Sequence, residues 1–283
     1  MIRNHWFLFS MVLMFSTDAL AAYETTLPAA GSRAVSDKAF NPAISLILDG
    51  QFGSFSNDEE LRDVPGFQLG EESGAFDEGF TLNESELVLQ ANVDDKFFAF
   101  ATVALEYEAG ETHVALEEAW LQTLTLPSGL QLKAGQFFSG VGYLNGFHPH
   151  ATDFVDDPLP YRVFLDGRFA DAGVQLTWTP ATLLYMQFGA ELLAGNSFPA
   201  AGAANDGVGA WSAFAKFGGD FNISNSWLAS ISRISADAVE RESGGTAEET
   251  DINPLFTGDS DMWLGAFVWK WAPRGNAGNR NFR

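Results

Sequence analysis

Residues 84–106, with the sequence ESELVLQANVDDKFFAFATVALE, largely determine the fold that we expect for this chain. Apolar residues occupy every second position from Leu87 to Val93, and the alternation resumes from Phe97 to Leu105. A period of two is that of a β-strand, and Asp94-Asp95 between the two runs predicts a short hairpin turn. Each run has roughly ten residues, about the length that a tilted strand needs to cross a bilayer.

The same alternation recurs along the rest of the 283 residues. No internal window offers the roughly 18 apolar residues of a membrane helix. We therefore expect an all-β chain with ten strands, two of them in the hairpin. The other strands are predicted at Ala43–Phe55, His113–Thr125, Leu130–Phe138, Ala172–Thr179, Leu183–Leu193, Val208–Phe217, Ser226–Ser235 and Met262–Trp271.

The predicted connections differ in length between the two ends of the strands. Long loops are expected at 56–79, 139–170, 194–207 and 236–261, whereas the turns at the opposite end are short. This asymmetry predicts a transmembrane antiparallel up-and-down β-barrel with its short turns in the periplasm. A secreted β-sandwich is the alternative, but that fold gives no reason for the asymmetry.

The two ends of the chain lead to separate expectations. Residues 1–21 are predicted to be a secretory signal peptide, because an apolar run follows Arg3 and small residues surround Leu20. An uncleaved anchor is the alternative. Residues 22–42 are expected to form a flexible periplasmic lead-in and residues 43–283 the barrel domain. The last residues hold no closing strand, which favours a C-terminally truncated larger barrel over a complete ten-stranded one.

The formal charge of −22 makes nucleic acid an unsuitable partner. There is no cysteine, so disulfides contribute nothing to stability. The partners that we expect instead are outer-membrane lipid and lipopolysaccharide, together with small hydrophilic solutes, at the bacterial cell outer membrane. A homotrimer is compatible with the sequence, which does not determine the oligomeric state.

Five segments of the chain carry a resemblance to known proteins: NPAISLILDGQF (41–52), NESELVLQANVDD (83–95), LEEAW (116–120), LPSGLQLKAGQFFSGVGYLNGFHPHATDF (126–154) and KWAPRGNA (270–277). They resemble a group of bacterial outer-membrane proteins of the porin superfamily, distantly similar to the phosphate-selective porin O and P family. The resemblance implies a barrel of about 16 or more strands and passive or facilitated passage of small solutes. Phosphate selectivity does not carry over, because an anion pore needs several Lys or Arg residues at its constriction.

Charged and polar residues on the strands are candidates for the pore lining. The candidates are Glu86, Gln90, Glu106, Glu118 and Lys133. Since acidic rings favour cations, a pore that selects by charge is expected to favour them here. The alternative is that these residues only hydrate the lumen and select nothing. The expected function is that of a porin-like channel for small hydrophilic solutes.

The long excursion at 139–170 is expected to act as a constriction loop, with Asn145, His148, His150 and Arg162 as its candidate residues. Imidazole and carboxylate together suit zinc or a similar divalent metal, so His148, His150 and Asp153 are a candidate metal site. Alternatively, these side chains hydrogen-bond to the barrel wall. The metal interpretation supports a second function, that of an outer-membrane receptor or metal-binding surface protein.

Enzyme motifs are missing from the sequence. There is no Gly-x-Ser-x-Gly elbow, no His-Glu-x-x-His and no phosphate-binding Gly-Lys-Ser/Thr loop. We therefore expect no enzymatic activity, no catalytic residue and no cofactor.

Overall fold

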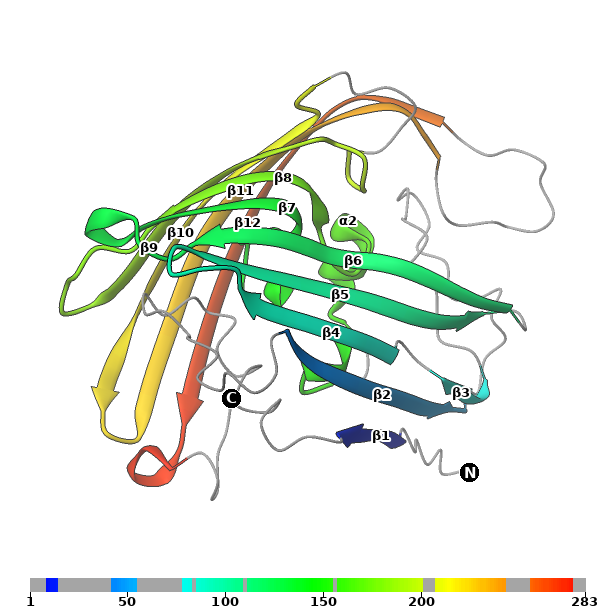
Figure 1. Cartoon of the computed structure of the whole chain (residues 1–283), viewed down its shortest axis with the longest axis horizontal. Coiled ribbons are helices and arrows are strands. Elements are labelled where there is room, and N and C mark those ends of the chain that lie inside the picture. Colours follow the sequence, from blue (N-terminus) through cyan, green and yellow to red (C-terminus); the bar gives the residue numbers. More distant parts are fainter. Residues whose placement is uncertain are drawn as a thin grey trace, which may run out of the picture.

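The protein folds as one antiparallel sheet of twelve strands (Figure 1). The structure is a computed structural model, and it describes residues 9–14, 42–54, 78–82, 85–108, 111–154, 157–200, 207–242 and 255–276. The strands are β1 Phe9–Met14, β2 Ala43–Gly53, β3 Gly79–Leu82, β4 Ser85–Asn92, β5 Phe97–Glu108, β6 Glu111–Thr123, β7 Leu130–Phe138, β8 Ala170–Trp178, β9 Tyr185–Leu193, β10 Ala210–Asn222, β11 Asn225–Glu242 and β12 Leu255–Trp271. The helix α2 covers Leu159–Leu165, and short 3₁₀ turns cover Pro127–Gly129, Leu144–Gly146, Pro149–Ala151 and Pro273–Gly275.

The strand order follows the chain, which makes the sheet an up-and-down meander. Only β3 departs from the sequential path, because it pairs with β2 beside β4. The sheet curves strongly between β4–β6 and β10–β12 (Figure 1). Within the described residues no ladder joins β12 to β1 or β2, so the sheet is open there. In the same part of the chain, no helix is long and apolar enough to cross a membrane.

The hairpin that defined the prediction is present as β4 and β5. The carboxylate of Asp94 accepts hydrogen bonds from the backbone N–H groups of Lys96 and Phe97, at 2.7 and 2.8 Å. This is the way in which Asp side chains stabilise tight turns. All ten predicted strands are found, and β7 has the predicted bounds.

Three elements were not predicted: β1, β3 and α2. Strand β1 lies inside the predicted signal peptide and pairs antiparallel with β2. The predicted loop at 236–261 is wrong for most of its length, because β11 and β12 continue pairing up to Glu242 and Leu255. Asp237, Gly258 and Asp259, residues of the kind that favours a loop, occupy ladder positions in these two strands. Residues 22–41, 55–77, 201–206, 243–254 and 277–283, which include most of the predicted lead-in and of the first long loop, lie outside the described residues.

The two faces of the sheet differ in an unusual way. Along β8, the polar side chains of Gln175 and Thr177 are 7% and 3% exposed, whereas Leu176 and Trp178 are 48% and 45% exposed. We call the face that carries Gln175 and Thr177 the inner face and the opposite face the outer face. The outer face also carries Val174 of β8 and large exposed apolar side chains on other strands, namely Ile44, Leu46, Leu116, Leu121, Phe188, Leu192, Trp211, Ile231, Trp263 and Phe267.

Candidate functional site

The inner face is covered by the chain segment 139–169, which we call the interior segment. Asn145 holds its two ends together and is fully buried. The Asn145 amide donates to the carbonyl oxygens of Ser139 and Phe169, at 2.8 and 2.9 Å, and its Oδ1 accepts from Phe169 N–H at 2.7 Å. Because one side chain satisfies three backbone groups, the segment closes into a compact loop beside the sheet.

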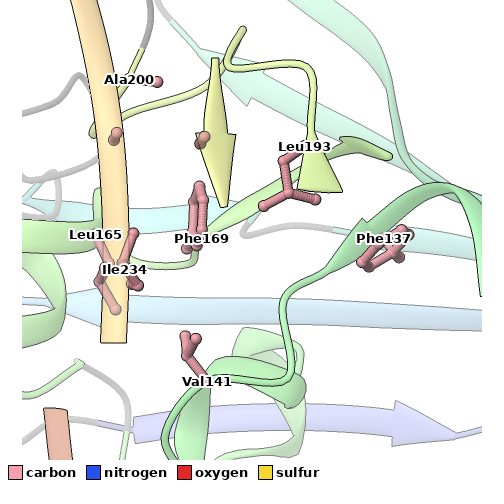
Figure 2. Packing of buried hydrophobic residues seen from close by; sticks show 9 residues of the cluster. Phe137, Val141, Leu165, Phe169, Leu193, Ala200 and Ile234 are labelled. Atoms are coloured by element: carbon pink, nitrogen blue, oxygen red, sulfur yellow. The ribbon is translucent and has the colours of Figure 1, made fainter. Parts of the chain in front are cut away.

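A small apolar core fixes the interior segment to β9, β10 and β11. Val141, Leu165 and Phe169 from the segment lie in one buried cluster with Leu193 of β9 and Ile234 of β11 (Figure 2). The α2 helix supplies Leu165 to this cluster, and Asp166 ends the helix in a left-handed conformation with φ of 51°. The sequence supports an ordered loop here because it alternates bulky apolar residues with turn formers.

Polar contacts bind the same segment to the sheet. The Gly142 N–H donates to Ser232 Oγ of β11 at 3.0 Å, and the Gly140 N–H donates to Glu191 of β9 at 2.7 Å. Glu191 also accepts from Gln175 Nε2 at 2.6 Å and from the hydroxyl groups of Ser139 and Ser212. A buried carboxylate with these donors is well satisfied, so Glu191 is a structural anchor of the segment.

Close packing accompanies these hydrogen bonds. A Cβ atom added to Gly140 would lie 2.4 Å from the Phe214 ring, and one added to Gly189 would lie 2.1 Å from it. The ring of Phe214 therefore fits between the segment and β9 only because both positions are glycine.

On α2, burial raises the pKa of the Tyr161 phenol above its ordinary value, in spite of hydrogen bonds with the backbone of Leu144 and Tyr143.

The part of the segment around His148 reaches β4 and β6, where three carboxylates meet the imidazole. His148 Nδ1 lies 3.1 Å from Glu86 Oε1 and 3.4 Å from Glu117 Oε2, while Nε2 lies 3.1 Å from Glu118 Oε2. His150 Nδ1 lies 2.7 Å from the same Glu86 Oε1. All of these side chains are buried or nearly so, and Glu86 has no exposed surface. We call these five residues the histidine cluster.

A β-bulge brings two adjacent glutamates to one imidazole. The ladder between β5 and β6 pairs Thr102 with Glu118 but Val103 with Leu116, so Glu117 is an extra residue in β6. In a regular strand, neighbouring side chains point to opposite faces. A bulge redirects one of them, and here both Glu117 and Glu118 reach His148.

Glu118 is itself held in place from two directions. Its Oε1 accepts from Trp120 Nε1 at 3.0 Å and from Phe138 N–H at 3.3 Å. The ring of Phe138 meets the His148 ring edge to face, with centroids 4.8 Å apart. The orientation of the His148 ring is therefore set by β6 and β7 of the sheet and not by the interior segment alone.

The predicted pore-lining residues have different surroundings. Glu86 and Glu118 belong to the histidine cluster, and Lys133 Nζ lies over the Trp120 ring at 4.7 Å. Gln90 is half-buried and shares the parity of Glu86 on β4, whereas the side chain of Glu106 on β5 lies outside the described part of the structure.

The residues predicted for the constriction loop and the metal site also have different surroundings. Asn145, His148 and His150 make the contacts given above, and Arg162 is half-buried on α2. The candidate metal ligand Asp153 is exposed. Among the described residues, the metal-ligating atoms that gather within 4.8 Å of one another belong to Glu86, Glu117 and His148.

Sequence reasoning missed Glu117 and Glu191. A signal for Glu117 exists, since exposed apolar residues hold even positions at Val114 and Leu116 but an odd position at Leu121. Such a change of parity requires an extra residue between them. Glu191 has no comparable signal, because its partners come from three separate segments, namely the interior segment, β8 and β10.

Comparison with known proteins gives little functional information. A protein of Aquifex aeolicus (strain VF5), described as "Uncharacterized protein", is 42% identical over 183 residues. The aligned region is 62% of this chain and 38% of that protein, so the chain spans well under half of its relative's length. No family model and no solved structure matches the chain.

Proposed function

We propose that the sheet is part of the wall of an outer-membrane β-barrel channel for small hydrophilic solutes. The observation that carries the proposal is the reversed polarity of the two faces, with buried Gln175 and Thr177 inside and exposed Leu176 and Trp178 outside. In water such an arrangement costs about 25 cal/mol for each Å² of apolar surface left exposed. In a lipid bilayer the same apolar face is favourable, and the polar face lines the lumen.

The size of the apolar face supports a lipid environment. Soluble monomers rarely expose contiguous apolar patches larger than a few hundred Å². Here large apolar residues are exposed on β2, β6, β8, β9, β10, β11 and β12, from Leu46 to Phe267. Closure of the barrel then requires β12 to pair with further strands, with a neighbouring copy or with β1 or β2.

The interior segment acts as the constriction in this proposal. It contacts β4 and β6 through His148 and contacts β9 and β11 through Gly140 and Gly142. A solute must therefore pass around the segment. Carboxylates of Glu86, Glu117 and Glu118 gather on one side of it, so we expect a preference for cations.

Planar-bilayer recording of the full-length protein tests the proposal. We expect discrete conductance steps and a reversal potential in a KCl gradient that shows cation preference. A triple variant with Glu86→Gln, Glu117→Gln and Glu118→Gln should lose that preference while still conducting. Lack of conductance from the wild type would contradict the channel.

A second candidate function is an outer-membrane receptor in which the interior segment closes the barrel. The buried bonds of Asn145 and Glu191 favour it, because they hold the segment on the inner face with little room for motion. The same recordings separate the two candidates. A receptor predicts a silent wild type and a conducting variant without residues 141–168, whereas the constricted channel predicts conductance from both.

A further inference from the structure

We propose that Glu86, Glu117 and His148 form a binding site for a divalent transition metal of the zinc type. The ligands come from β4, from the bulge of β6 and from the interior segment. The site does not require the protein to conduct, although Glu86 and Glu117 are also carboxylates to which the proposed channel owes its cation preference. It differs from the site expected from sequence, because two wall carboxylates take the place of Asp153.

Distances within the histidine cluster suit this chemistry. Zinc binds nitrogen and carboxylate oxygen at about 2.0–2.2 Å, which places the ligand atoms of a tetrahedral site about 3.4 Å apart. His148 Nδ1 already lies 3.1 Å from Glu86 Oε1 and 3.4 Å from Glu117 Oε2. All three ligand atoms fall within 4.8 Å of one another, so only a small adjustment brings them around one ion.

The second nitrogen of His148 has the partner that metal-binding histidines usually have. When one ring nitrogen binds a metal, the other commonly donates its proton to a carboxylate or carbonyl, which fixes the tautomer. His148 Nε2 faces Glu118 Oε2 at 3.1 Å, and Glu118 is fixed by Trp120 and the Phe138 N–H. This carboxylate lies outside the three proposed ligands and orients the ring so that Nδ1 points to the ion.

The charge of the cluster also favours a divalent cation. Three carboxylates meet at His148, and Lys133 acts electrostatically on Glu118. A histidine that binds a metal through Nδ1 is neutral, so the three carboxylates then outnumber the positive charge of Lys133. An excess of buried negative charge is costly unless it is compensated, and a bound divalent ion compensates it.

The donor set narrows the choice of metal. Imidazole with carboxylates suits zinc and its first-row neighbours, whereas calcium and magnesium prefer oxygen alone. His150 Nδ1 lies 2.7 Å from Glu86 Oε1, the oxygen that also faces His148, and helps to position that carboxylate. The side chain of Glu117 keeps 12% of its surface exposed, which gives an ion a route to the site. Three protein ligands leave a fourth position for water or a solute.

Calorimetric titration of the detergent-solubilised, chelator-treated full chain with zinc chloride tests the site. We expect one zinc ion per chain, and at least a tenfold loss of affinity in Glu117→Gln and in His148→Gln. Asp153→Asn is the matched control, since it removes an exposed carboxylate of the same segment, and it should bind as the wild type does. Circular dichroism checks that each variant keeps its sheet.

Cobalt substitution gives a spectroscopic test of the site that needs no variant. Cobalt bound to the wild type should show the intense visible absorption of a four-coordinate site with nitrogen and oxygen ligands. No zinc binding by the folded wild type would overturn the proposal. It would also be overturned if Asp153→Asn lost as much affinity as His148→Gln, or if Glu117→Gln bound zinc unchanged.

Discussion

Glu117 and Glu118 are neighbours in the sequence, yet the carboxylates of both reach the imidazole of His148. Glu117 Oε2 lies 3.4 Å from Nδ1, and Glu118 Oε2 lies 3.1 Å from Nε2. A regular strand cannot place two successive side chains in this way. The extra residue in β6 thus gives the two carboxylates different roles. Glu117 is available to an ion, and Glu118 orients the imidazole ring of His148.

Deletion of Glu117 should preserve the sheet and abolish the metal site. A chain without Glu117 restores regular alternation, because Leu116 still faces outward and Glu118 still faces inward. Deleting Ala119 instead should turn the Glu118 carboxylate to the outer face and lower stability. Gel migration of samples heated to increasing temperatures would compare the stability of the two deletion variants. Equal stability of both deletions would argue against the bulge.

Asn145→Ala should loosen the interior segment. The change removes three hydrogen bonds of about 1 kcal/mol each, so we expect a loss of about 3 kcal/mol in the free energy of unfolding. Limited proteolysis should then cut between residues 139 and 169, where the wild type resists. Asp153→Ala is the control, because its side chain is exposed in the same segment. Similar cleavage of the two variants would show that Asn145 does not hold the loop.

Gly189→Ala should destabilise the protein through the Phe214 ring, because the added Cβ would lie 2.1 Å from it. Overpacking of this kind typically costs about 1–3 kcal/mol. Phe214→Leu creates space at the same place, so the double variant should be more stable than the sum of the single effects allows. Melting temperatures of the four proteins give this coupling, and strictly additive effects would exclude the contact.

Stability should fall at high pH through Tyr161. Burial raises the pKa of this phenol in the folded state, so its contribution is complete below pH about 10 and is lost as the pH rises through the folded-state pKa. Tyr161→Phe removes the titrating group. Melting temperatures measured between pH 8 and 11.5 should therefore fall less steeply for the variant, and parallel curves would contradict the assignment.

The strands could be predicted because a period of two is a local property of the sequence. The Asp94-Asp95 turn and β7 illustrate this, since neighbouring residues alone determine them. The histidine cluster could be predicted only in part. His148 and His150 were evident as a pair, but Glu86 lies 62 positions before His148, and nothing local indicates that they meet. The prediction of Asp153 rests on nearness in sequence, whereas the carboxylates that gather around His148 come from β4 and β6 of the sheet.

The exposed apolar positions change parity between Leu116 and Leu121, which implies a bulge in this strand. A bulge beside two glutamates implies two inward carboxylates. The position of Asn145 could not be inferred in the same way, because its partners are backbone groups whose placement depends on the whole segment.

Spin labelling tests most directly whether the outer face meets lipid. The chain has no cysteine, so single cysteines can be introduced at Val174, Leu176 and Thr177 without background. In protein reconstituted in vesicles, labels at Val174 and Leu176 should collide readily with oxygen and poorly with a water-soluble nickel complex. The label at Thr177 should be protected from lipid. Ready access of the nickel complex to positions 174 and 176 would contradict the membrane-embedded sheet.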